Sequence, residues 1–167
     1  NLSATATTTL LVKNFNTTIG SIIAYYPFTN HTNDISGNQL NGVASGIAFV
    51  NDRNGVPNSA GFFNGGTQNV NVANSPLLNV TNALTVSCWF KASSLGSKEL
   101  FLMSHGSWQN RWKLSITPEK NLRWTVNTLT TIADLDAPTP FVVDSFYYVT
   151  AAYDGSFMTI YVNGNLV

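Results

Sequence analysis

The chain has 167 residues, of which 44% are hydrophobic and 10% are charged, well below the roughly 25% charge of average soluble domains. Eight basic and eight acidic side chains cancel, so no surplus of positive charge is present to attract nucleic acid. The apolar content is high enough for a folded core, and no stretch approaches the roughly 20 apolar residues of a membrane-spanning helix. The sequence therefore predicts one globular domain with a neutral, polar surface.

Residues 1–19 form a Thr-rich start that predicts a linker or a leading edge strand. From residue 20 onward, short β-branched and aromatic runs alternate with turn residues, and their period of two is typical of strands. We expect strands at 21–28, near 43–50, 61–63 and 68–73, and then at 84–90, 100–104, 111–116, 122–126, 147–153 and 157–162. This spacing predicts an all-β fold, an antiparallel β-sandwich of two sheets over residues 20–167.

The last predicted hairpin is unfinished. The strand at 158–162 runs into the tight turn signal Asn163-Gly164, and only three residues follow it. Such a strand would expose an unpaired apolar edge, which natural proteins avoid. We therefore expect that the domain at 20–167 lacks its last strands and that the polypeptide continues, or that another element pairs here.

Four N-x-S/T sequons favour an extracellular or surface-exposed setting, in which attached glycans supply solubility that charge does not. They begin at Asn1, Asn16, Asn30 and Asn79. In a chain this rich in Asn and Thr several such triplets arise by chance, so this remains a compositional argument.

Six segments occur in the order found in a known family of jelly rolls. In chain order they are AYYPF at 24–28 with NDISGN at 33–38, GFFNG at 61–65, LTVSCWFK at 84–91, YVTAAYDG at 148–155 and IYVNGNLV at 160–167. On these residues the chain resembles laminin-G-like jelly roll domains of the concanavalin A-like lectin/glucanase superfamily. The resemblance implies a concanavalin A-like sandwich used mostly in extracellular recognition, adhesion or carbohydrate binding.

The resemblance also raises the question of catalysis, because glucanases of this fold carry paired carboxylates that alternate on one strand. The two glutamates, Glu99 and Glu119, lie in polar turn sequences. Asp134 and Asp136 alternate, but the prolines that follow them predict a loop. We therefore expect solvated loop acids and no glycosidase pair among these residues.

The sequence also offers no suitable set of residues for nucleophilic catalysis or for a zinc site. Cys88 falls on the apolar side of the strand at 84–90, which predicts a small buried hydrophobe. His31 and His105 lie in turn sequences, and no strand–G-x-S-x-G–helix elbow is present. With two histidines and one cysteine a tetrahedral zinc site is not expected.

Calcium is a more plausible ligand. Asp34 precedes a tight Ser-Gly-Asn turn, and hard cations prefer carboxylate and backbone oxygens from such a loop. The resemblance implies a second ligand at Asn64, an oxygen donor without charge where the family has an acid. The alternative is that Asp34 caps its own turn through local hydrogen bonds.

Sorting the strands by their period of two predicts an outward face that could bind sugar, since aromatic rings stack on sugar C–H faces and Arg binds acidic sugars. The residues predicted on this ligand-binding face are Trp89, Arg111, Lys113, Arg123, Tyr148 and Tyr161, with Trp108 at its rim. Trp112 and Trp124 alternate with apolar residues and are expected in the core. The alternative is that this face packs against a neighbouring domain or subunit.

The sequence thus predicts a non-catalytic extracellular recognition module that binds a glycan or a glycosylated surface, with calcium as a possible cofactor. One alternative is a structural surface subunit or domain of a fibre, envelope or virion assembly, joined through its sheet edges. A weaker alternative is an accessory domain of a glycosidase.

Overall fold

The computed structural model describes residues 4–6, 22–106, 112–128, 130–139 and 141–167. The described part is built from strands and one short 3₁₀ turn, η1 (Pro76–Leu78). The strands are β1 (Ala4–Ala6), β2 (Gly42–Ser45), β3 (Ala48–Val50), β4 (Ala60–Phe63), β5 (Asn69–Val72), β6 (Leu84–Ala92), β7 (Leu100–His105), β8 (Trp112–Ile116), β9 (Asn121–Asn127), β10 (Ile132–Pro138), β11 (Phe146–Tyr153), β12 (Met158–Val162) and β13 (Asn165–Leu166). None of these residues belongs to a helix long and apolar enough to cross a membrane.

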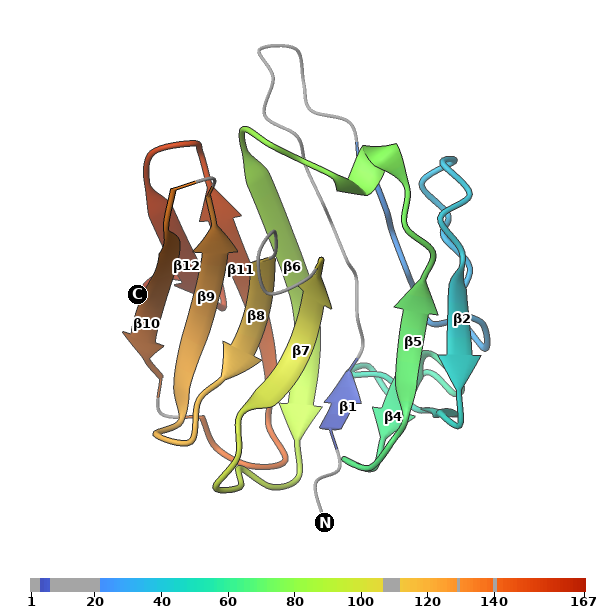
Figure 1. The fold of residues 1–167 in the computed structure, drawn as a ribbon. Coiled ribbons are helices and arrows are strands. Elements are labelled where there is room, and N and C mark those ends of the chain that lie inside the picture. The colour runs from blue at the N-terminus through green and yellow to red at the C-terminus, as the bar shows by residue number, and fades with distance from the viewer. Residues whose placement is uncertain (1–3, 7–21, 107–111, 129, 140) are drawn as a thin grey trace.

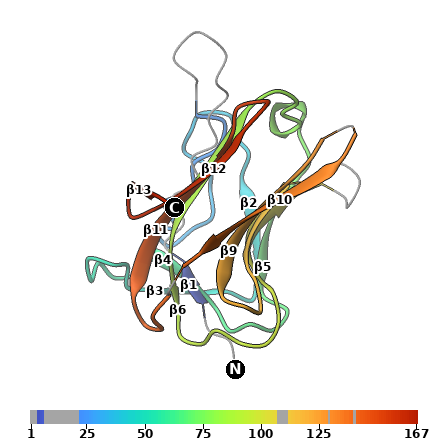
Figure 2. The ribbon, with the colours of Figure 1, turned by 90° about the vertical axis from the view of Figure 1, so that its left-hand side faces the viewer.

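Two antiparallel sheets form the body of the molecule (Figure 1). One has seven strands in the order β13-β12-β11-β6-β1-β4-β3, and the other has four in the order β10-β9-β8-β7. A separate two-stranded sheet pairs β2 with β5. Turned by 90°, the two larger sheets lie as two layers (Figure 2). The predicted all-β, two-sheet jelly-roll sandwich is confirmed.

The core lies between these layers because every second residue of each strand points inward. The seven-stranded sheet contributes Val86, Cys88, Phe90, Val149, Ala151 and Ile160, and the four-stranded sheet contributes Leu114, Ile116, Leu122 and Trp124. Cys88 is 1% exposed, and burial raises the pKa of its thiol to about 12, which confirms it as a buried apolar residue.

The longest pairing in the fold joins β6 to β11 over eight residues, from Phe146 opposite Lys91 to Tyr153 opposite Leu84. In this register the odd-numbered residues of β11, such as Val149, face the core and the even-numbered ones, such as Tyr148, face outward. A slip by one residue would exchange the two faces of the sheet. The register therefore decides which aromatic side chains remain accessible.

Two expectations for the N-terminal third are wrong. Ala4–Ala6 pairs with both β4 and β6, so these three residues form an interior strand of the seven-stranded sheet and not a linker or an edge, while the rest of the predicted segment 1–19 lies outside the described residues. The predicted strand at 21–28 is an irregular segment after an isolated bridge at Ile22. It is held by side chains instead: Tyr26 and Phe28 are buried, and the Tyr26 hydroxyl donates to the Leu40 carbonyl at 2.6 Å.

A third expectation is also wrong, because the acidic segment expected as a loop is a strand. β10 pairs with β9 over seven residues and forms an edge of the four-stranded sheet. Pro138 ends β10, where a missing N–H costs no ladder bond, since an edge strand has a partner on one side only. Asp134 and Asp136 therefore alternate along a strand.

Candidate ligand-binding site

Aromatic side chains gather on the outer side of the seven-stranded sheet. Trp89 of β6 lies opposite Tyr148 of β11, and their ring centroids are 5.3 Å apart. The Tyr148 hydroxyl donates to the Ser87 hydroxyl at 3.0 Å, which fixes the phenol ring over β6. Both aromatic residues are only partly buried, so their rings are held in place and still reach solvent.

Tyr161 of β12 belongs to the same surface. It lies opposite Thr150, which is two residues along β11 from Tyr148 and therefore on the same side of the sheet. Three of the predicted ligand-binding residues, Trp89, Tyr148 and Tyr161, thus share one face, as the alternation predicted. Sequence reasoning found them because each neighbour in the strand is buried in the core.

Two cations that the described residues place on this face were not predicted there. The guanidinium carbon of Arg53 lies 4.5 Å from the centroid of the Trp89 ring, and Lys91 Nζ lies 5.0 Å from that of Phe146. Arg53 comes from the loop between β3 and β4, and nothing in its sequence indicates that this loop turns over β6. We call Arg53, Trp89, Lys91, Phe146, Tyr148 and Tyr161 the aromatic face.

Lys113 and Arg123 were predicted beside Trp89, and this grouping is wrong. They lie on β8 and β9, in the four-stranded sheet, whereas Trp89 is in the other layer. Sequence alternation gave each residue its side of a strand but not the sheet to which the strand belongs. The remaining two predicted residues, Trp108 and Arg111, lie outside the described residues.

Lys113 is a buried cation with a fixed partner. Its side chain is 8% exposed, and Nζ lies 2.6 Å from Glu99 Oε1, which also accepts from the Ser115 hydroxyl at 2.7 Å. Burial acts to raise the pKa of Glu99, but these hydrogen bonds and the Lys113 charge outweigh it and hold the pKa below its usual value. Because its ammonium is enclosed and paired, Lys113 is poorly placed to contact a ligand.

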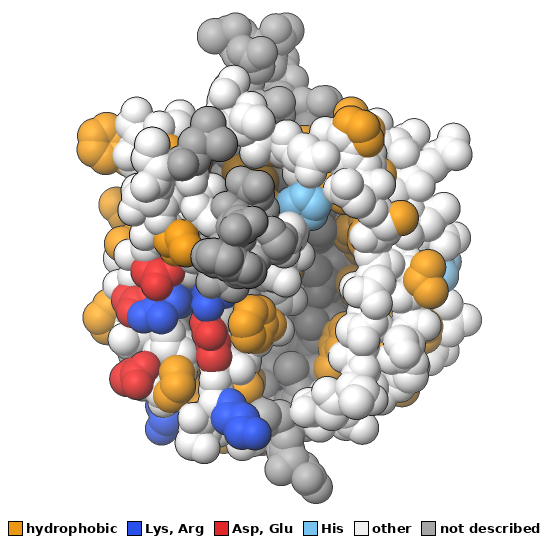
Figure 3. Space-filling view, viewed as in Figure 1, with side chains coloured by type: hydrophobic (Ala, Val, Ile, Leu, Met, Phe, Trp, Pro, Cys, Tyr) orange, Lys and Arg blue, Asp and Glu red, His pale blue; other side chains and the backbone are white. Residues whose placement is uncertain are grey.

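Arg123 is paired on the same outer side. Its Nε and Nη2 both donate to Asp136 at 2.6 Å, and Nη1 lies 3.6 Å from Asp134 Oδ2. The bidentate hydrogen bond from Arg123 lowers the pKa of Asp136. Figure 3 shows these charges gathered on the face that the four-stranded sheet presents to the viewer. We call Glu99, Lys113, Arg123, Asp134 and Asp136 the charged cluster.

The charged cluster does not have the electrostatics of a glycosidase pair. A general acid needs a carboxyl group whose pKa is raised, so that it is protonated at working pH. Among the described carboxyl groups whose pKa departs from its usual value, namely Asp34, Glu99, Asp136 and Asp154, the shift is downward in every case. Lys113 donates to one oxygen of Glu99, and Arg123 donates to both oxygens of Asp136.

The Asp34 carboxylate is hydrogen-bonded to groups of its own loop and of the segment before it. Its two oxygens accept four hydrogen bonds, from the N–H groups of Tyr25, Ser36 and Leu40 at 2.8–3.0 Å and from the Ser36 hydroxyl at 2.8 Å. Burial acts to raise the pKa of Asp34, but these donors outweigh it and lower the pKa. This is the turn-capping role that the sequence left open.

Calcium binding stays a prediction. Asn64 is exposed, and its side-chain oxygen accepts from the Gly66 N–H at 2.9 Å. Within the described residues, no group of three or more His, Cys, Asp or Glu side chains is placed to hold a metal ion. A calcium ion at Asp34 would therefore need backbone and amide oxygens for most of its coordination.

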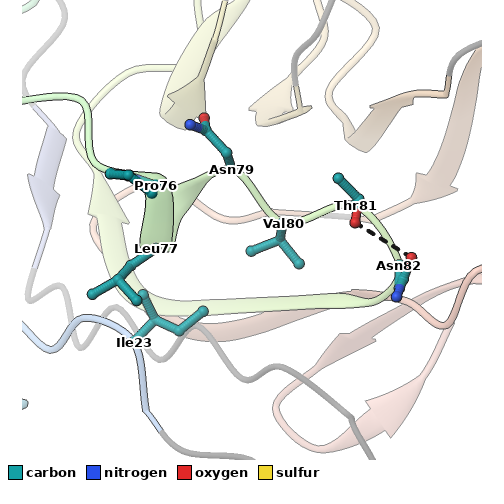
Figure 4. Close-up of a pocket in the computed structure, with 7 residues that line it drawn as sticks. All are labelled: Ile23, Pro76, Leu77, Asn79, Val80, Thr81 and Asn82. Atoms are coloured by element: carbon teal, nitrogen blue, oxygen red, sulfur yellow. Dashed lines mark hydrogen bonds between the residues drawn. The ribbon is translucent and has the colours of Figure 1, made fainter.

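Two hollows lie on either side of the segment that leads into β6. The smaller, of about 270 Å³, is bounded by Ile23, Pro76, Leu77 and residues 79–82. Figure 4 shows Leu77 beside Ile23 in this hollow, while Asn79 points away from both. The larger, of about 580 Å³, opens between the two sheets beyond Leu84, and we call it the end pocket.

His105 lines the end pocket, although its sequence predicted a surface turn. It is the last residue of β7 and is partly buried, with its ring centroid 6.2 Å from that of Trp112. Trp124 is fully buried, as predicted, whereas Trp112 packs at the margin of the core. Burial lowers the pKa of His105, so the imidazole is neutral at pH 7.

Comparison with known proteins gives one match. Residues 64–167, more than half of the chain, match the family model described as the concanavalin A-like lectin/glucanases superfamily. A search of curated proteins finds no match. The matched range contains β5 to β13 and includes all of the aromatic face except Arg53.

We expect Asp34→Ala to destabilise the protein by about 3 kcal/mol, because it leaves three backbone N–H groups without their acceptor. Urea unfolding of the variant beside the wild type measures this loss. Asp52→Ala is the matched control, since Asp52 caps an exposed loop in the same way through the N–H groups of Asn54 and Val56. An equal loss in both variants would contradict the assigned role of Asp34.

We expect Glu99→Gln to cost about 2 kcal/mol at pH 7, because it leaves the Lys113 ammonium enclosed without its counter-charge. The folded pKa of Glu99 lies below the unfolded value of about 4.3, so the pair stabilises the fold at neutral pH and this contribution is lost as the pH falls through the folded pKa. Urea unfolding between pH 7 and 3 should therefore show the two proteins converging in acid. A difference that is constant with pH would contradict this.

Proposed function

The chain belongs to the concanavalin A-like lectin/glucanases superfamily, and from this premise we propose that it is a non-catalytic recognition module that binds carbohydrate or a glycosylated surface through the aromatic face. The observation that carries the proposal is the Trp89–Tyr148 pair, held on the outer side of a rigid sheet with Arg53 over the Trp89 ring. Membership of the superfamily supports a binding module in general, and the aromatic face supports sugar as its ligand.

The chemistry of the face suits a sugar. Pyranose rings present C–H groups that stack on aromatic planes, while their hydroxyl groups need hydrogen-bond partners at the edge of the contact. Trp89, Tyr148 and Tyr161 supply aromatic surface, while Arg53, which lies over the Trp89 ring, and Lys91, which lies over the Phe146 ring, supply donors. Because the Tyr148 hydroxyl is bonded to Ser87 and its ring contacts Trp89, little conformational entropy of this pair is lost on binding.

The absence of catalysis is part of the proposal. The described carboxylates with shifted pKa values are held ionised by hydrogen bonds, and the aromatic face carries none of them. Stacking and hydrogen bonding alone then account for recognition. An extracellular setting and a glycoprotein partner agree with the four sequons and with the low charge of the surface.

One observation favours a structural role as a second candidate. β13 is a two-residue edge strand, and Leu166 on it is 65% exposed and lies opposite Tyr161, beside the aromatic face. An exposed apolar residue next to exposed aromatic rings is typical of a surface that contacts another protein. In this case the aromatic face would contact a neighbouring subunit of a surface assembly.

We expect Trp89→Ala to lower affinity for the bound glycan about tenfold or more, because removing a stacking ring costs about 1.4 kcal/mol or more. A glycan array identifies the ligand, and calorimetry then compares the wild type with the variant. Phe101→Ala is the matched control, since Phe101 is 58% exposed but lies on the four-stranded sheet.

Equal weakening by both substitutions, or an array without any signal, would contradict glycan binding at the aromatic face. Concentration-dependent assembly that Trp89→Ala abolishes, without any glycan signal, would instead support the structural candidate. Far-ultraviolet circular dichroism of each variant establishes that its fold is retained.

A further inference from the structure

We propose that the end pocket is a second binding site and that it takes a single neutral sugar residue that carries an apolar group, such as the methyl of an N-acetyl substituent. It is separate from the aromatic face, which lies on the outer side of the seven-stranded sheet, whereas the end pocket opens between the two sheets. The proposal does not depend on the aromatic face binding a ligand.

The pocket forms where both sheets come to an end. The last pair of the β6–β11 ladder is Leu84 with Tyr153, and the last pair of the β8–β9 ladder is Trp112 with Val126. All four residues line the pocket. The two pairs belong to opposite layers, so the inward face of each sheet contributes one aromatic and one aliphatic side chain to the walls.

The size of the pocket fits a small ligand. Its volume is about 580 Å³, and ligand sites in proteins commonly span about 300–1,000 Å³. The walls are mainly apolar because Leu78, Val80 and Ala83 extend the surface made by the two terminal pairs. An apolar group of a sugar that packs against these side chains would lose its contact with water, and so would the side chains, which favours binding.

The polar groups of the pocket are amides, hydroxyls and one imidazole. They come from Asn79, Thr81, Asn82, His105, Asn127, Thr128 and Thr130. Asn79 Oδ1 lies 3.2 Å from His105 Nε2, so these two side chains form a bridge across the wall of the pocket. Groups of this kind both donate and accept, which suits the hydroxyl groups of a sugar.

The charge of the ligand follows from the charge of the walls. None of the described residues that line the pocket is Lys, Arg, Asp or Glu. A uronate, sulfate or phosphate brought between the sheets would lose hydration without gaining a counter-charge from the described walls, and this is costly. The aromatic face, with Arg53 and Lys91, differs in this respect, so the two sites select different sugars.

The indole of Trp112 adds a second observation. Its Nε1 is buried and has no hydrogen-bond partner in the structure. An unpaired buried donor costs about 1–3 kcal/mol, and the same cost applies to Trp124 Nε1, which does not line the pocket. Asn79 of the pocket wall begins an N-x-S/T sequon, and a glycan attached there would stand at the pocket. The protein for the test is therefore made in a bacterial host, which leaves the Asn79 side chain unmodified.

The test is a ¹H–¹⁵N NMR titration of the 167-residue chain with three probes: methyl N-acetylglucosaminide, methyl glucoside and methyl glucuronide. We expect the N-acetylated probe to shift the backbone amides of His105, Val126 and Tyr153 most and the glucuronide to leave them unchanged. Asn79→Trp should abolish these shifts, because the exposed Asn79 is replaced by a ring at the pocket wall. Trp89→Ala should leave them as in the wild type.

No shift at these three amides with any probe would overturn the proposal, as would shifts by the glucuronide alone. Shifts confined to Trp89 and Tyr148 would also overturn it, while supporting the aromatic face. Should Asn79→Trp lose the dispersion of a folded spectrum, His105→Ala replaces it. This variant removes a polar group from the pocket, and unchanged affinity for the N-acetylated probe would likewise overturn the proposal.

Discussion

The pairing of β6 with β11 is the constraint on which the core and both candidate sites depend. One register places Val86, Cys88 and Val149 against the opposite sheet and turns Trp89 and Tyr148 outward. The same register ends with Leu84 opposite Tyr153, which become two walls of the end pocket. Since side chains alternate with a period of two, a slip of one residue would bury polar and ionised groups such as Lys91 and expose the core.

The sequence predicted what is set locally along one strand. Alternation assigned Trp89, Tyr148 and Tyr161 to the outward side and Cys88 and Trp124 to the core, and the structure confirms these assignments. These inferences needed only that each strand be half-buried, a condition that the sequence itself displays. The spacing of the strands predicted the sandwich, and the family resemblance added that it is a concanavalin A-like jelly roll.

What the sequence did not predict depends on contacts between distant segments. Lys113 and Arg123 share their outward orientation with Trp89, but strand order places them in the other sheet. Arg53 reaches Trp89 from a loop 36 positions earlier in the chain, and a loop direction has no periodic signal. Pro138 argued for a loop because a proline inside a strand is costly, yet this cost disappears at the end of an edge strand.

The few charges of the chain are divided unequally, and this division separates the possible functions of its surfaces. The charged cluster holds five of the sixteen charged residues, and its acids and bases are bonded to one another. A ligand that bound there would have to break these ion pairs first. The free energy lost in breaking them would be comparable to the free energy gained from the ligand's own contacts. On the aromatic face, Arg53 and Lys91 lie over rings instead, and their remaining donors can be offered to a ligand without breaking an ion pair that the described structure contains. The same argument explains why a neutral pocket at the end of the sandwich is compatible with the fold: its walls need no counter-charges, so hydrophobic burial alone can hold them in place.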